Sequence, residues 1–121
     1  MSNYFLNIGP TGDGSIPKET VDTFSAIGKW MAVNAESIRG TAASESGKLA
    51  FDGRLTRKGA VHYAHVFKRP ADGLLTVPFK AAKATLLAGG QALKVTAGGK
   101  ESVIELPTDL PDPIATVIRC E

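Results

Sequence analysis

The chain has 121 residues, enough for one domain, or one domain with an appendage, around a moderate hydrophobic core. Its net charge is only +2 and no Lys/Arg run is longer than Lys68-Arg69, so we expect no nucleic-acid partner. No apolar segment has the length of a membrane helix, so we expect no membrane partner either. A single cysteine, Cys120, excludes an internal disulfide and leaves the redox compartment open.

The first predicted elements are a strand and a helix joined by a glycine-rich loop. Tyr4 to Ile8 is a short apolar run with two aromatic residues, which is typical of a buried strand. Gly9-Pro10 breaks this run, and a loop through Asp13 follows between further glycines. Pro17 favours a helix start, because the first turn of a helix does not need its missing N–H. Such a β-α unit normally lies among sister units, and none follows, so we expect the last unit of a larger fold.

The helix is predicted to run from about Pro17 to about Ile38. At about 100° per residue it has one apolar stripe and an opposite charged face. Trp30 and Val33 flank the stripe and form a second apolar patch, and Gly40 ends the helix by taking a positive φ. The stripe consists of Val21, Phe24, Ile27, Met31 and Ile38.

Beyond the helix the sequence pattern changes from helical to strand-like. Residues 41–50 are small, polar and turn-rich, and we predict a linker there. The remaining residues alternate with period two and are interrupted by turn signals such as Gly89-Gly90 and Gly98-Gly99. Short strands without a second helix predict a mainly β fold, an antiparallel β-sandwich preceded by one α-helix. The predicted strands are 54–57, 61–67, 74–77, 82–87, 92–96, 102–106 and 114–120.

The first part of the chain resembles a known family. The segments NYFLNIGPTGDGSIP and IGKWMAVNAESIRGT resemble the end of the catalytic barrel in family 29 glycoside hydrolases, the α-L-fucosidases. The segments VHYAHVF, ALKVTAGG and LPDPIATVI extend the resemblance more weakly over nearly the whole chain, with departures at Ala35 and Arg39. The resemblance implies that residues 1–40 are the last strand, βα-loop and helix of a (β/α)8 barrel. It also implies that 41–50 are a linker and 51–121 a C-terminal β-sandwich accessory domain.

The acidic residues of this chain do not form a catalytic pair. A retaining glycosidase needs two carboxyl groups about 5 Å apart across the scissile bond. Here the carboxylates lie in turns, on a solvated helix face or singly on exposed strands, so we assign no catalytic residue. The resemblance agrees, because the fucosidase nucleophile and acid/base belong to earlier barrel strands. It implies a parent enzyme, periplasmic, secreted or lysosomal, that removes terminal α-L-fucose with retention from fucosylated glycans. Its barrel would be the partner of the helix.

Three other groups of residues are candidate sites. The glycine loop lacks the Gly-Lys-Ser/Thr ending of a P-loop, and Asp13 would repel a phosphate, so a structural turn is favoured. His62 and His65 point to opposite faces of a strand and cannot share a metal ion, so we expect one at the surface and the other a polar group at the sheet rim. No cofactor or metal site is therefore predicted. Asn7 and Asp13 remain candidates for binding, because the resemblance places them at the active-site rim of the parent; for Asn7, pinning of the loop backbone weighs equally.

An independent carbohydrate-binding module is the alternative function. Such modules present exposed aromatic platforms, and beyond the linker the aromatic residues are Phe51, Tyr63, Phe67 and Phe79. Tyr63 and Phe67 share a strand face with Val61, which we predict to be core. The sequence leaves this alternative open.

Overall fold

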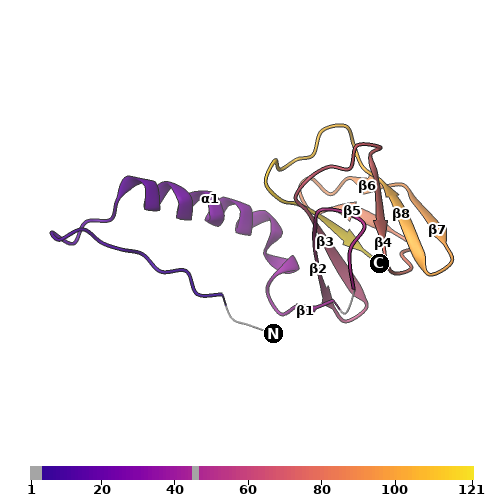
Figure 1. The fold of residues 1–121 in the computed structure, drawn as a ribbon, viewed down its shortest axis with the longest axis horizontal. Coiled ribbons are helices and arrows are strands. Elements are labelled where there is room, and N and C mark those ends of the chain that lie inside the picture. Colours follow the sequence, from indigo (N-terminus) through magenta and orange to yellow (C-terminus); the bar gives the residue numbers. More distant parts are fainter. Residues whose placement is uncertain (1–3, 45–46) are drawn as a thin grey trace. The chain divides into compact units, whose positions relative to one another are not determined.

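The computed structural model describes residues 4–44 and 47–121 of the chain. The chain forms two compact units, Met1–Ala35 and Glu36–Glu121. The first contains helix α1, and the second contains all the strands β1 to β9 (Figure 1). Each unit has its own internal organisation, and the two are described in turn.

Helix α1 spans Lys18–Asn34 and begins where the sequence predicts. Pro17 precedes it with φ of −53°, the value that the proline ring imposes and that suits a helix start. The predicted end at Ile38 is too late, because a 3₁₀ turn, η1 (Ala35–Ser37), replaces the last α-helical turn. Gly40 then has φ of +71°, a left-handed conformation that favours glycine, and it turns the chain away as predicted.

The predicted strand at Tyr4 to Ile8 does not form. Residues 4–10 have no regular secondary structure, and Tyr4 and Phe5 are each 87% exposed. A strand satisfies its N–H and C=O groups by pairing with a neighbouring strand. The described residues of the first unit contain no other strand, which explains why the prediction is wrong for this chain.

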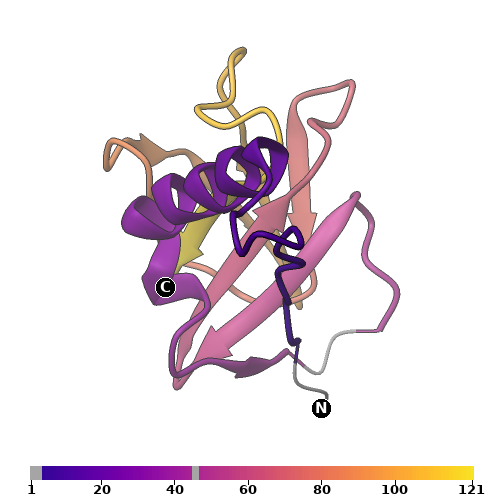
Figure 2. The ribbon, with the colours of Figure 1, turned by 90° about the vertical axis from the view of Figure 1, so that its left-hand side faces the viewer.

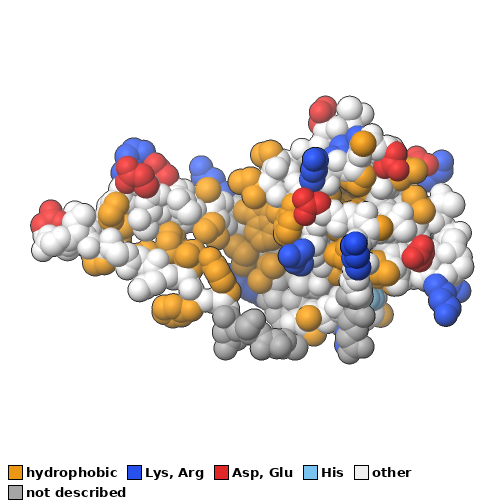
Figure 3. Space-filling model, in the orientation of Figure 1, with side chains coloured by type: hydrophobic (Ala, Val, Ile, Leu, Met, Phe, Trp, Pro, Cys, Tyr) orange, Lys and Arg blue, Asp and Glu red, His pale blue; other side chains and the backbone are white. Residues whose placement is uncertain are grey.

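The apolar stripe of α1 is largely exposed. Val21, Phe24 and Ile27 retain 47%, 38% and 42% exposure, although Met31 and the flanking Trp30 are half-buried. Hydrophobic side chains gather along the visible face of α1 and of the segment before it (Figure 3). An amphipathic helix normally buries such a stripe against a neighbour. The first unit therefore leaves most of this apolar stripe exposed.

The second unit is an antiparallel β-sandwich, as predicted. The larger sheet has the order β1-β2-β3-β9-β5-β6 and the smaller sheet β4-β8-β7. Figure 2 shows β2 and β3 as long neighbouring strands of the larger sheet. The strands are β1 (Ala42–Ala43), β2 (Gly53–Lys58), β3 (Val61–Val66), β4 (Leu74–Val77), β5 (Ala84–Leu86), β6 (Ala92–Leu93), β7 (Val95–Gly98), β8 (Glu101–Glu105) and β9 (Thr116–Cys120).

The core of the sandwich lies between the two sheets. Leu55, Ala64 and Ile118 stand side by side on β2, β3 and β9, and the smaller sheet contributes Leu75 paired with Ile104. All five belong to one buried hydrophobic cluster. Full burial of a Leu or Ile side chain stabilises a fold by about 1.5–3 kcal/mol. The second unit thus has a hydrophobic core of its own.

Three details of the second unit differ from the sequence predictions. Residues 41–50, predicted as a linker, contain β1, which pairs with β2. The predicted strand 92–96 is two strands: β6 pairs with β5 in the larger sheet, whereas β7 pairs with β8 in the smaller. The predicted core face of β3 is the wrong one, because the core side chains are Ala64 and Val66. Tyr63 is buried on the opposite face, beside Glu36, and Phe67 is 43% exposed.

Candidate functional site

The glycine-rich loop before α1 is organised around the carboxylate of Asp13. Asp13 Oδ1 accepts hydrogen bonds from the hydroxyl of Thr11, from the Ser15 hydroxyl at 2.8 Å and from the Ser15 N–H at 3.1 Å. Backbone bonds from Thr11 N to Ser15 O (2.9 Å) and from Gly14 N to Thr11 O (2.8 Å) close the loop. The sequence LNIGPTGDGSIP thus folds into a turn whose acidic side chain bonds its own backbone, as Asp commonly does in turns.

These hydrogen bonds determine the charge of Asp13. The Thr11 and Ser15 hydroxyls, followed by the Ser15 N–H, lower the pKa of Asp13 to about 2. A carboxyl group with a pKa this low stays ionised at every physiological pH. General-acid chemistry needs a raised pKa instead, so Asp13 is unsuited to protonating a leaving group.

Asn7, the other predicted binding residue, lies in the irregular segment before this loop. Its side-chain Oδ1 accepts a hydrogen bond from the N–H of the next residue, Ile8, at 2.9 Å. The side chain is exposed, and residues 4–10 carry no secondary structure that would aim it at a fixed point. In this chain Asn7 therefore contacts its own backbone, and no described residue joins it to Asp13.

Several acidic side chains of the second unit have hydrogen-bond or ion-pair partners. Asp72 accepts from the Leu74 N–H at 3.0 Å, and Asp112 accepts from the Ile114 N–H at 2.8 Å. Glu105 pairs with Lys94 at 2.9 Å, and Arg119 pairs with Glu121 at 2.9 Å and Glu36 at 3.8 Å. These carboxylates cap turns or pair with bases. Their partners are backbone N–H groups and basic side chains, whereas glycoside hydrolysis needs two carboxyl groups that face each other across the scissile bond.

The two histidines occupy opposite faces of β3, as the period of two predicts. His62 faces the core side and stacks on Phe79, with ring centroids 4.0 Å apart. His65 is only 5% exposed, and its Nε2 lies 3.2 Å from Thr56 Oγ1. The expectation of a surface histidine is wrong, because His65 is buried and His62 is half-buried near the start of β3. Within residues 4–44 and 47–121, no cluster of three His, Cys, Asp or Glu could hold a metal ion.

A polar cluster covers the outer face of the larger sheet, and the sequence did not reveal it. Ser37 is fully buried, and its carbonyl oxygen accepts a 2.6 Å hydrogen bond from Thr56 Oγ1. On the same face Tyr63 lies opposite both Thr56 and Arg119, and Glu36 is close to Tyr63 and Arg119. The only sequence signal for this cluster is that Thr56 is next to the core residue Leu55 on a strand, so its side chain points to the outer face. Its neighbours on that face can be named only when the β2–β3 register is known.

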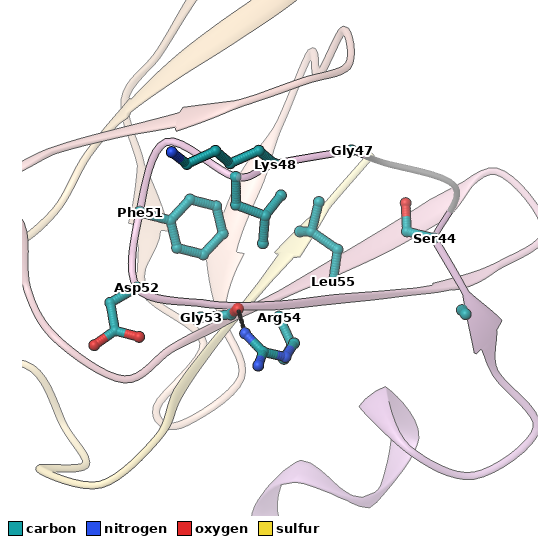
Figure 4. A pocket seen from close by; sticks show the side chains of 10 residues that line it. Ser44, Gly47, Lys48, Phe51, Asp52, Gly53, Arg54 and Leu55 are labelled. Atoms are coloured by element: carbon teal, nitrogen blue, oxygen red, sulfur yellow. Dashed lines mark hydrogen bonds between the residues drawn. The ribbon is translucent and has the colours of Figure 1, made fainter. Parts of the chain in front are cut away.

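An open hollow borders β2. It has a volume of about 530 Å³, and Figure 4 shows Phe51 and Leu55 inside the bend of chain that ends at Gly53, with Asp52 directed away. Gly53 is required there, because an added Cβ would lie 2.0 Å from the carbonyl oxygen of His65. Phe51 and Leu55 pack on the core. The hollow is thus mainly the flank of the hydrophobic core, and its residues do not converge on a ligand.

No helix in the described ranges is long and apolar enough to cross a membrane.

Comparison with known families identifies the chain. A family model described as alpha-L-fucosidase matches residues 1–36, the segment containing the glycine loop and all of α1. Tissue alpha-L-fucosidase of Bos taurus is 31% identical over 94% of the chain, and alpha-L-fucosidase of Dictyostelium discoideum is 38% identical over 60% of it. The chain is similar in sequence to α-L-fucosidases over nearly its whole length. The resemblance seen in the first segment of the sequence is thereby confirmed.

Solved fucosidase structures share the fold of this chain. Alpha-L-fucosidase isoenzyme 1 from Paenibacillus thiaminolyticus matches 95% of the chain with a TM-score of 0.84 at 31% identity. A family 29 α-L-fucosidase from Bacteroides thetaiotaomicron, trapped as a covalent intermediate, matches 95% with a TM-score of 0.84 at 29% identity. The chain spans 29% and 27% of these two structures, 26% of the bovine relative and 16% of the Dictyostelium one.

Proposed function

We propose that this chain is the non-catalytic C-terminal portion of a retaining α-L-fucosidase that removes terminal α-L-fucose from fucosylated glycans. Residues 1–40 would supply the last strand, loop and helix of the catalytic barrel. Residues 41–50 would connect them to the accessory β-sandwich of residues 51–121. Asn7 and Asp13 would lie at the rim of the active site, where the βα-loops of such a barrel gather.

The observation that carries this proposal is the exposed apolar stripe of α1. The family match covers this helix, and Val21, Phe24 and Ile27 are between 38% and 47% exposed. Barrel helices bury such a stripe against their strands. The scattered carboxylates of this chain support a non-catalytic role, since the nucleophile and acid/base would come from the barrel.

The alternative, an independent carbohydrate-binding module, has weaker support. Of the aromatic side chains beyond residue 50, Tyr63 is 4% exposed, Phe51 packs on the core and Phe79 stacks on His62. Only Phe67, at 43% exposure, remains as a candidate platform. Carbohydrate-binding modules usually recognise sugars through exposed aromatic rings, so we favour the accessory role.

A chimera tests the proposed function. The region of the Paenibacillus thiaminolyticus enzyme that aligns with this chain is replaced by residues 1–121, and hydrolysis of an aryl α-L-fucoside is measured. We expect kcat/KM within about tenfold of the unmodified enzyme, a barrier change of about 1.4 kcal/mol. The same chimera with Phe24→Asp and Ile27→Asp should lose assembly and activity, because a buried unpaired carboxylate costs several kcal/mol.

The matched control is Lys29→Asp, which changes an exposed side chain of the same helix. This variant should be as active as the unsubstituted chimera. Full activity in the Phe24→Asp, Ile27→Asp chimera would show that the stripe does not face the barrel. A soluble chimera with folded domains and no activity would also contradict the proposal.

A further inference from the structure

Hydrogen-bond geometry fixes the proton positions around Ser37. Thr56 has one hydroxyl proton, and it is donated to the Ser37 carbonyl oxygen over 2.6 Å. Toward His65 Nε2, 3.2 Å away, Thr56 Oγ1 therefore acts as acceptor, so Nε2 carries the imidazole proton. In the neutral ring Nδ1 is then the nitrogen without a proton. The His65 ring also forms a hydrogen bond with the backbone of Ser37.

The surroundings of His65 disfavour a second ring proton. His65 is 5% exposed, and burial lowers its pKa, although the hydrogen bond to Ser37 opposes part of that effect. On β2, the residue directly opposite is Arg54, a cation on the same face, and on β9 it is the uncharged Val117. The other charged or titratable groups of this face are Lys58, Tyr63, Arg119, Glu36 and Glu121. Both acids, Glu36 and Glu121, already pair with Arg119.

We propose that His65, Thr56 and Ser37 form an acid-sensitive clasp that holds the segment after α1 on the outer face of the larger sheet. The neutral ring and the Thr56 hydroxyl bind the Ser37 carbonyl. Protonation places a second N–H on Nδ1 of a buried ring with a cation opposite it. The imidazolium gains hydration by leaving this position, and the Ser37 carbonyl then loses its contact with the ring and keeps only the Thr56 hydroxyl as donor. This device lies within the second unit and does not depend on the proposed fucosidase function.

The sign of the pH dependence follows from the neutral buried ring. A histidine whose pKa is lower in the closed state stabilises that state fully above its ordinary pKa of 6.5, and the stabilisation declines as pH falls below 6.5. The decline continues until the pKa of the closed state is reached. Over that window the clasp should weaken by up to about tenfold per pH unit.

NMR of the full chain between pH 7.5 and pH 5 tests the clasp. The ring nitrogen and carbon shifts of His65 should show the Nε2–H tautomer at pH 7.5. The carbonyl carbon of Ser37 should then shift with the same midpoint as the His65 ring, and that midpoint should lie below 6.5. His65→Gln keeps a donor but has no titratable ring, so the shift of Ser37 with pH should disappear. His62→Gln, on the opposite face of β3, should leave it unchanged.

Three results would overturn the proposal. One is an Nδ1–H tautomer of His65 at pH 7.5. Another is a Ser37 carbonyl whose shift stays constant while the His65 ring titrates. The last is an undiminished Ser37 titration in His65→Gln. The first two are measured on the unsubstituted chain, so they decide the question even where His65→Gln does not fold.

Discussion

Thr56 Oγ1 donates a 2.6 Å hydrogen bond to the carbonyl oxygen of Ser37, which is 19 residues earlier in the chain and fully buried. This bond joins a strand of the larger sheet to the turn that follows α1. A buried carbonyl needs a donor, and here a side chain from another element supplies it. The outer face of the larger sheet therefore carries a buried, specific hydrogen bond. It differs in this from the solvated outer face expected of a sandwich of this size.

Thr56→Val should reduce the free energy of unfolding by about 1 kcal/mol. The substitution keeps the shape of the side chain and removes the donor to Ser37, and a typical hydrogen bond contributes about that much. Denaturant unfolding followed by circular dichroism measures the effect. Thr56→Ser, which retains the hydroxyl, should lose less than half as much. Equal destabilisation by the two variants would contradict the importance of the hydrogen bond.

Ile104→Ala should destabilise the sandwich by about 2–5 kcal/mol, the usual range for truncating a buried Ile. Ile104 is fully buried and lies between Leu75 and Val95 of the neighbouring strands. On the same strand Glu101 is exposed, and Glu101→Ala should change the unfolding free energy by at most about 0.5 kcal/mol. Urea midpoints of the two variants provide the comparison. A decrease of less than about 1 kcal/mol in the unfolding free energy of Ile104→Ala would show that Ile104 is not part of the core.

The sequence predicted the elements that depend on local residues. Pro17 and Gly40 bound the helical region, and the Gly89-Gly90 and Gly98-Gly99 pairs form the β5–β6 and β7–β8 hairpins. The sequence-based prediction failed where strand formation depends on pairing between residues far apart in the chain. Tyr4 to Ile8 has strand composition but no strand to pair with among the described residues of its unit. The choice of sheet for β6 and β7 depends on distant partners, and no local pattern encodes it.

Asp13 should titrate with a pKa near 2. The Thr11 and Ser15 donors hold its carboxylate ionised, well below the ordinary value of 3.8. Carboxyl-carbon NMR shifts between pH 1.5 and 6 measure the midpoint, in the range where the loop remains ordered. The double variant Thr11→Val, Ser15→Ala removes both hydroxyls and should raise the pKa of Asp13 toward 3.8. An unchanged midpoint in that variant would show that the hydroxyls do not set it.

The candidate site was less predictable than the fold. The position of Asp13 in a tight loop was expected, because Asp between glycines favours a turn. Its bonds to Thr11 and Ser15 depend on side-chain directions that the spacing alone does not give. The burial of His65 was missed for a related reason. A strand with period two has two faces, and the sequence does not show that residues 36–37 cover the second one.

Free fucose should not bind specifically to the sandwich. Tyr63, Phe51 and Phe79 are covered or stacked, which leaves Phe67 as the one exposed ring of that domain in the described ranges. Titration of the ¹⁵N-labelled chain with fucose should therefore give no saturating shifts at low-millimolar concentration. Saturating shifts that cluster around Phe67 and vanish in Phe67→Ala would favour the carbohydrate-binding module instead.

The rate at which the purified chain hydrolyses an aryl α-L-fucoside tests whether these 121 residues carry catalysis. Under the proposed function the catalytic carboxylates lie outside them. We therefore expect a rate equal to that of buffer alone, at protein concentrations where an intact relative is readily active. Turnover that follows the folded chain through purification, and that a single Asp→Asn or Glu→Gln substitution abolishes, would contradict it.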